Sequence, residues 1–263
     1  MIHFTNILKH KFTNHIAMYR KKGLIAALLM VMGAATMEAR VTMGPLFNDH
    51  MVLQQDTEVR VWGWTDKPGS TVTVKTSWAK GKVKAKSGDD GRWDMRLATP
   101  KGGFTPQTVS VSDGDGKVVI NDVLIGEVWL ASGQSNMEQP LHGFNGCPVE
   151  NSAQYIAEAM KYKDRLHFCT VDFAANIEPQ DTVGAQWQNC EPGTARDFCA
   201  VAYFFGIRML EALQNCPVGM INSWCSEKTH GMVEKILDRV DPSQVMSLIN
   251  AIYFKGDWVK DFN

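Results

Sequence analysis

Short alternating runs of apolar and polar residues fill the chain between Val41 and about Ile120. A period of two directs alternate side chains to the two faces of a strand, and the Gly, Asp and Pro residues between the runs are typical of turns. The pattern predicts a small antiparallel β-sandwich whose Trp residues belong to its core. The runs are EVRVWGW (58–64), TVTVKT (71–76), KVKAK (82–86), RWDMRL (92–97) and TVSVSD (108–113).

The pattern changes after residue 122. VWLAS (128–132), RLHFCTV (165–171) and PVGMI (217–221) have the continuous apolar character of buried strands. Apolar positions at helical spacing lie between them, at 151–162 and 198–210, and strands that alternate with helices predict a parallel α/β sheet. We therefore expect a β-sandwich domain at 40–122 and an incomplete α/β domain at 123–221. The first helix would bury Ala153, Ile156, Ala157 and Met160 on one face.

The first 39 residues have the character of upstream sequence followed by a signal peptide. Arg20, Lys21 and Lys22 precede an apolar stretch at 23–35, which is too short for a membrane span and ends in small residues suited to cleavage. We expect translation to start at Met18. The sequence thus predicts a protein exported to the periplasm or the cell exterior, with no membrane association after cleavage.

The balance of charged residues limits which kinds of molecule the protein can attract. Twenty-seven basic and 28 acidic residues give a net charge of −1, so no general attraction to nucleic acid or to an anionic membrane is expected. The partner is then a small or neutral molecule. The six cysteines have spacings that fit no metal site, and we expect mostly buried thiols.

One serine stands where an open α/β sheet forms its ligand crevice. Ser135 follows the apolar run at 128–132, and loops at the carboxyl ends of parallel strands form such crevices. A helical turn from Asn136 would direct free N–H groups toward an oxyanion, and Gly133 would let a substrate approach. Gly-Gln-Ser-Asn lacks the flanking glycines of the strained Gly-x-Ser-x-Gly elbow, so a helix cap and a nucleophile are equally favoured by these residues.

A resemblance to a known family changes that balance. GEVWLASGQSNMEQPL (126–141) strongly resembles the nucleophile block of sialate O-acetylesterases and related exported carbohydrate acetylesterases, within the SGNH hydrolase superfamily. LFNDHMVLQQDTEVRVWGW (46–64), DFCAVAYFFG (197–206) and PVGMINS (217–223) are similar to further blocks of that family. The resemblance implies a β-sandwich before a three-layer α/β domain, with Ser135 as nucleophile and its own N–H in the oxyanion hole. It also implies that Gly133, Gln134, Asn136, Met137 and Glu138 shape the site.

The activity implied by the resemblance is hydrolysis of an acetyl ester on sialic acid or another carbohydrate. Ser135 Oγ would attack the acetyl carbonyl, a histidine would take its proton, and water would then release acetate. Neither a metal nor an organic cofactor is expected.

This interpretation requires a histidine base, and the sequence does not provide one in the expected block. The family carries it in an Asp-x-x-His block near the C-terminus, and the sequence lacks that block. His142 lies in the loop PLHGFNGCP (140–148) and could reach the crevice, but no partner carboxylate is evident. Asp164 and His167 spell Asp-x-x-His, yet the apolar strand around His167 favours a core histidine, and His230 suits a surface helix. We expect a weak or inactive esterase; the alternative is a non-catalytic fragment or a glycan-binding β-sandwich protein.

Residues 222–263 resemble a different family. NAIYFKGDW (250–258) is a specific match to the central segment of serpins, which implies a helix followed by a strand. The string from Ile221 to Trp224 is similar in both families, so we interpret the chain as a chimera, made by recombination or by assembly of two sequences. Serpins inhibit through a reactive loop absent from this sequence, so inhibition is the least favoured function. The apolar run at 245–254 could pair with an open edge of the α/β sheet.

Overall fold

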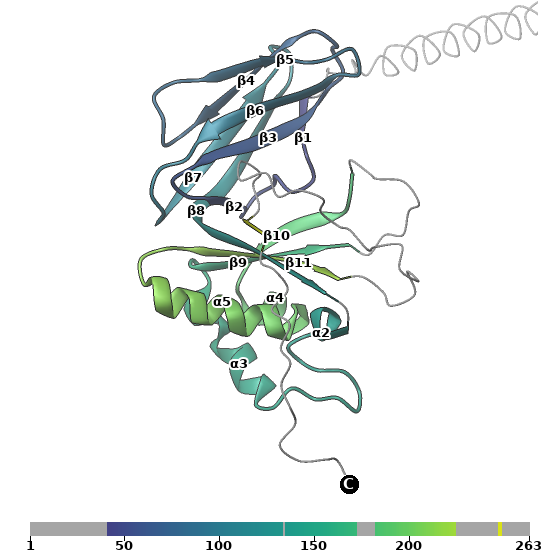
Figure 1. Cartoon of the computed structure of the whole chain (residues 1–263), viewed down its shortest axis with the longest axis vertical. Coiled ribbons are helices and arrows are strands. Elements are labelled where there is room, and N and C mark those ends of the chain that lie inside the picture. The colour runs from purple at the N-terminus through teal and green to yellow at the C-terminus, as the bar shows by residue number, and fades with distance from the viewer. Residues whose placement is uncertain (1–40, 134, 173–181, 225–246, 249–263) are drawn as a thin grey trace, which may run out of the picture. The chain divides into compact units, whose positions relative to one another are not determined.

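The computed structural model describes residues 41–133, 135–172, 182–224 and 247–248, which all lie within one unit formed by residues 39–263 (Figure 1). These residues form a mixed, sheet-rich fold with few helices. In this described part no helix is long and apolar enough to cross a membrane. The expected signal sequence, Gln134, Cys225, His230 and most of the serpin-like tail lie outside the described residues.

The first part of the chain forms two sheet regions whose buried faces share one hydrophobic core. Each of the five alternating runs in the sequence becomes a strand, and alternate residues such as Val59 in one sheet and Val72 in the other are buried around Trp93. The first sheet has the order β1–β3–β6, with β1 (Val41–Met43), β3 (Glu58–Thr65) and β6 (Arg92–Ala98) antiparallel. The second has the order β8–β7–β4–β5, with β4 (Thr71–Thr76), β5 (Val83–Lys86), β7 (Gly103–Ser112) and β8 (Lys117–Gly133).

Strand β8 belongs to both halves of the fold. It runs for 17 residues without a break, through residues 122 and 123, where the sequence suggested a domain boundary (Figure 1). Its first part pairs antiparallel with β7, and its last seven residues, 127–133, pair in parallel with β11 (Val218–Trp224). The short β2 (Val52–Gln54) pairs in parallel with its middle. The two halves are therefore joined by continuous backbone hydrogen bonding.

The α/β sheet has the order β10–β9–β11–β8, with β9 (Leu166–Val171) parallel to β11. This confirms the parallel pairing expected for the three apolar runs. β10 (Ala185–Asn189) is an antiparallel edge strand that the sequence did not predict. β12 (Ser247–Leu248) pairs in parallel with Trp129 and Leu130 of β8, so the tail does reach the sheet at these two residues.

In the described part, helices cover one face of this sheet: α3 (Ser152–Glu158), the 3₁₀ turn η1 (Ala159–Tyr162), α4 (Pro192–Asp197) and α5 (Ala200–Leu213) (Figure 1). Leu166, Phe168 and Met220 are buried against them. Cys169 and Ile221, which alternate with these residues along the strands, are buried in the first core instead. The period of two thus assigns one strand face to the helices and the other to the first part of the chain.

The expected buried face of the first helix is wrong at three positions. Ala153, Ala157 and Met160 are exposed, whereas Ala159 is buried and Ile156 partly buried. The α-helix ends at Glu158 and continues as a 3₁₀ turn. Because a 3₁₀ turn advances more degrees per residue than an α-helix, the apolar stripe drawn from a period of 3.6 no longer applies at Met160.

Candidate active site

Ser135 lies at the edge of the sheet where the parallel strands end. It begins the short helix α2 (Ser135–Glu138), two residues after β8 ends at Gly133. Its side chain is exposed, and its hydroxyl makes no hydrogen bond to any other described residue. Because β8, β9 and β11 are parallel, their carboxyl ends share this edge, which is where α/β sheets bind ligands.

A buried amide attaches α2 to the sheet. Asn222 of β11 is 3% exposed, and its Nδ2 donates a hydrogen bond of 3.0 Å to the Met137 carbonyl. A Cβ at Gly133 would lie 3.0 Å from Met137 Cγ, so the glycine permits close approach of α2 to β8. Asn136 and Glu138 are exposed beside Ser135. Sequence reasoning did not single out Asn222, although its place at the end of the strand PVGMINS was the available signal.

His142 has a carboxylate neighbour that the sequence did not reveal. The segment after α2 pairs with the segment between α4 and α5: the Leu141 N–H donates to the Phe198 carbonyl at 2.9 Å, and the His142 N–H donates to the Arg196 carbonyl at 3.1 Å. This pairing places His142 Nε2 3.5 Å from Asp197 Oδ1. Both side chains are partly exposed, at 36% and 63%. Arg196 Nη1 lies 3.2 Å from the same carboxylate oxygen.

His167 is part of the core. It is 1% exposed on β9, and its ring Nδ1 donates a hydrogen bond of 2.6 Å to the His50 carbonyl. Its Nε2 is buried and has no hydrogen-bond partner among the described residues. Burial lowers the pKa of His167 below its ordinary value, and the His50 carbonyl partly opposes this shift. Of the two candidate bases, the structure therefore places a carboxylate beside the partly exposed His142 and buries His167 in the core.

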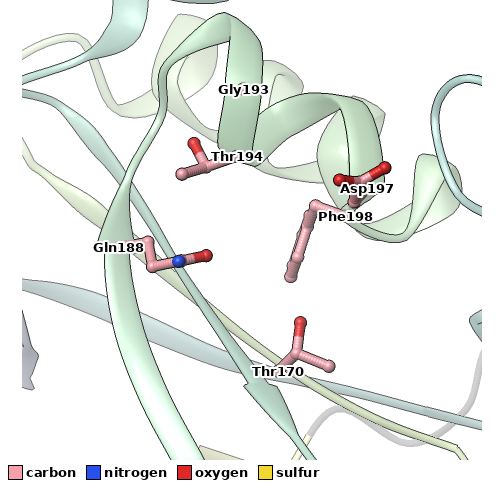
Figure 2. Close-up of a pocket in the computed structure, with 6 residues that line it drawn as sticks. All are labelled: Thr170, Gln188, Gly193, Thr194, Asp197 and Phe198. Atoms are coloured by element: carbon pink, nitrogen blue, oxygen red, sulfur yellow. The ribbon is translucent and has the colours of Figure 1, made fainter.

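A cavity of about 180 Å³ adjoins the His142–Asp197 pair. Figure 2 shows the Gln188 amide and the Thr170 hydroxyl directed toward the space beside the Phe198 ring. The Phe198 ring stacks on Phe168, with centroids 4.1 Å apart. The lining consists of Thr170 on β9, Gln188 on β10, Gly193, Thr194 and Asp197 on α4, and Phe198.

The described cysteines are free thiols, and four of the five are buried, as expected. Cys147 is the exposed one. Burial raises the pKa of Cys169 to about 12 and that of Cys190 to about 12, so neither is a reactive thiolate at neutral pH. In the described ranges no group of three or more His, Cys, Asp or Glu side chains could hold a metal ion.

Comparison with known proteins relates most of the chain to acetylesterases. Sialate O-acetylesterase from Homo sapiens is 29% identical over 195 residues, which cover 67% of this chain and 36% of that protein. The enzyme of the same name from Rattus norvegicus is 28% identical and is covered to 34%. The crystal structure of a carbohydrate acetylesterase from Xanthomonas citri matches with a TM-score of 0.63 and 32% identity, over 70% of this chain and 40% of that one. The chain thus spans about a third of the length of these curated relatives.

The C-terminal end is similar to another family. The model for serpins, serine protease inhibitors, matches residues 207–263. A leukocyte elastase inhibitor from Xenopus laevis is 53% identical over 45 residues, which cover 16% of this chain and 12% of that protein. The serpin match begins within α5, ahead of the junction expected near Ile221. The chain is therefore similar to carbohydrate acetylesterases over about two thirds of its length and to serpins at its C-terminal end, which confirms the composite resemblance predicted from its sequence.

Proposed function

We propose that this chain carries the nucleophile segment of a carbohydrate O-acetylesterase, with Ser135 as nucleophile. The observation that carries the proposal is the position of Ser135: it is exposed, it follows the parallel strand β8, and it lies on a helix attached to β11 through Asn222. The acetylesterase names of the relatives supply the bond to be cleaved. An acetyl ester of sialic acid or of another sugar is the proposed substrate.

The proposed chemistry is acyl transfer through an acetyl-enzyme. Ser135 Oγ bonds to the acetyl carbonyl carbon while His142 accepts the hydroxyl proton, and the sugar leaves as an alcohol after taking that proton. The Ser135 N–H stabilises the oxyanion. Water then attacks the acetyl-enzyme, with its proton taken by His142, and releases acetate. The Asp197 carboxylate, 3.5 Å from His142 Nε2, orients the imidazole ring.

We propose that turnover is weak, because the acid–base pair is poorly oriented. The 3.5 Å separation of His142 and Asp197 exceeds an ordinary charge-assisted hydrogen bond of about 2.7–2.9 Å. Both side chains are open to solvent, which screens their attraction, and Arg196 competes for the same carboxylate oxygen. An activity well below that of a buried triad follows.

The finer architecture belongs to the same proposal. We interpret the two sheet regions that share the first core as a β-sandwich domain before the hydrolase domain, and residues 222–263 as a serpin-derived helix and strand. We further propose that the basic and apolar segment at 20–39 directs export, so that the enzyme meets its carbohydrate outside the cytoplasm.

Acetate release from an aryl acetate and from an acetylated sugar tests the proposal. Replacing the nucleophile in Ser135→Ala removes the covalent step, so we expect release to fall to the uncatalysed rate. Ser152→Ala is the matched control, since Ser152 also begins a short helix, α3, and should leave the rate unchanged. Equal rates for the wild type and Ser135→Ala would contradict the proposal and favour the non-catalytic glycan-binding protein.

The base is tested separately with His142→Gln. If His142 accepts the serine proton, we expect kcat to fall by about 10²-fold or more while the protein stays folded, because that is the usual contribution of a general base. An unchanged kcat, with Ser135→Ala inactive, would show that the base lies elsewhere in the chain.

A further inference from the structure

The cavity beside Asp197 has the chemistry of a sugar-binding subsite. We propose that it holds one neutral, hydroxyl-rich sugar ring of the substrate and that it disfavours a carboxylated sugar. This inference rests on the proposed acetylesterase function and names the class of sugar that the site would accept.

The polar lining suits hydroxyl groups. The Gln188 side chain is exposed on β10, and its amide can donate to one hydroxyl oxygen and accept from a second hydroxyl. Thr170 presents a hydroxyl from the neighbouring strand, and Asp197 offers carboxylate acceptors (Figure 2). Thr194 takes no part, because its Oγ1 already donates to the Asn189 carbonyl at 2.5 Å and accepts from the Glu191 N–H at 3.0 Å. Gln188, Thr170 and Asp197 are therefore the recognising groups.

The size and the aromatic wall suit a single ring. A volume of about 180 Å³ is below the 300–1,000 Å³ or so that is usual for drug-sized ligands, so the occupant is small. Stacking on Phe168 holds the Phe198 ring in place at one wall of the cavity. Because Phe198 is only 3% exposed, its ring closes the cavity and offers little surface to a ligand, and the hydroxyls of the sugar would meet Gln188 and Thr170.

The charge of the lining separates neutral sugars from acidic ones. Asp197 contributes a carboxylate, and the cavity has no Lys or Arg among its lining residues. Arg196 contacts Asp197 but is not part of the lining. An anionic sugar such as a sialic acid would bring its carboxylate beside that of Asp197, and such juxtaposition of like charges excludes a ligand.

The cavity also adjoins the candidate base. Asp197 and Phe198 form part of its wall, and the same two residues contact the 141–142 segment, through the 3.5 Å approach of His142 and the Leu141 hydrogen bond. A sugar in the cavity therefore lies next to the side chain that would move the proton. The subsite therefore lies beside the proposed base.

Binding measured without turnover tests the inference. The probes are methyl β-xyloside as the neutral sugar and the methyl glycoside of N-acetylneuraminic acid as the anionic one, titrated into the full chain and followed by ligand-observed NMR. We expect the neutral glycoside to bind more tightly, and Gln188→Ala to weaken it about fivefold through loss of a hydrogen bond. Gln186→Ala is the control, since Gln186 lies on the same strand but bonds Asn48 instead of lining the cavity.

A separate substitution tests whether the Asp197 charge disfavours an anionic sugar. Asp197→Asn keeps an acceptor but removes the negative charge, so we expect the anionic glycoside to gain affinity severalfold while the neutral one changes little. Tighter binding of the anionic glycoside by the wild type, or no effect of Gln188→Ala, would overturn the inference. Ser135→Ala should bind the neutral probe like the wild type. If the wild type binds the neutral probe but releases no acetate, the esterase proposal is refuted and the subsite stands.

Discussion

At the scale of single residues, a polar cluster of the partly exposed His50 and Asp122 and the buried His167 joins the two parts of the fold. His50 Nδ1 lies 2.7 Å from Asp122 Oδ2, and the His50 carbonyl accepts the hydrogen bond from His167. His50 and Asp122 both have left-handed backbones, at φ 68° and 52°, which is uncommon for residues other than glycine. Because a carbonyl only accepts, His167 Nδ1 carries the proton and the buried Nε2 has none in the neutral ring. Asn189, opposite His167 on β10, also has a buried oxygen without a partner among the described residues.

This cluster predicts loss of stability in mild acid. The pKa of His167 is lowered from 6.5 by burial, so below pH 6.5 the unfolded chain binds a proton that the folded chain does not. Stability is thus fully present above the unfolded pKa and falls as the pH drops from there toward the folded pKa, by at most about 1.4 kcal/mol per pH unit for one group. Urea unfolding at pH 7.5 and 5.5 measures this loss. The charge of the neighbouring His50 also lowers the pKa of His167, whereas the charges of Asp122 and Asp164 raise it and so reduce the loss.

The matched variant for this measurement is His167→Asn, which retains a side-chain donor near the position of Nδ1 but does not titrate. We expect its stability to depend less on pH between 7.5 and 5.5. His142→Asn, at an exposed position, should keep the wild-type dependence. Equal dependence in wild type and His167→Asn would assign the acid sensitivity to another group.

At the scale of elements, one glycine sets how closely β8 and β11 approach. The Glu127 N–H donates to the Pro217 carbonyl at 2.9 Å, which starts the parallel pairing of the two strands. A Cβ at Gly126 would lie 2.1 Å from that same Pro217 oxygen. The obstacle is backbone and not a mobile side chain, so relief would require the strands to separate.

Gly126→Ala should therefore destabilise the fold by about 1–3 kcal/mol or more, as overfilled cores do. Gly81→Ala is the control: a Cβ there meets no atom within 4 Å, and we expect a change within about 0.5 kcal/mol. The urea midpoints of the two variants, measured at one pH, give the difference in their stability. A Gly126→Ala midpoint equal to that of Gly81→Ala would mean that the strands separate at no cost.

At the scale of the whole molecule, the junction between the two family resemblances is better integrated than expected. From the sequence alone, packing should deteriorate directly after Ile221, because the serpin-like segment begins there. Instead, β11 continues to Trp224 with its pairing to β8 intact, and Asn222 is buried and bonded to α2. The acetylesterase-like sheet thus extends at least three residues past the expected junction.

For residues 225–246 and 249–263, which lie outside the described residues, poor packing stays a prediction. The run NAIYFKGDW resembles a strand of serpins and not a block of the acetylesterases, so its local preference was not selected together with the sheet that precedes it. Limited proteolysis followed by mass spectrometry should cleave residues 225–263 before any site in residues 41–120. Protection of the tail equal to that of residues 41–120 would contradict this expectation.

The sequence by itself determined the elements whose period is strong. The alternating runs of 58–113 all form strands, and the three apolar runs form parallel strands, because burial of one face or of both faces leaves a readable pattern. It also located Ser135 after such a strand. It could not give the short strands β1, β2 and β10, which depend on neighbours for their pairing. Only the tertiary structure brought Asp197 to His142, Asn222 to Met137 and Gln188 to Phe198, because each pair joins residues whose proximity is created by sheet order and backbone pairing and leaves no period in the sequence.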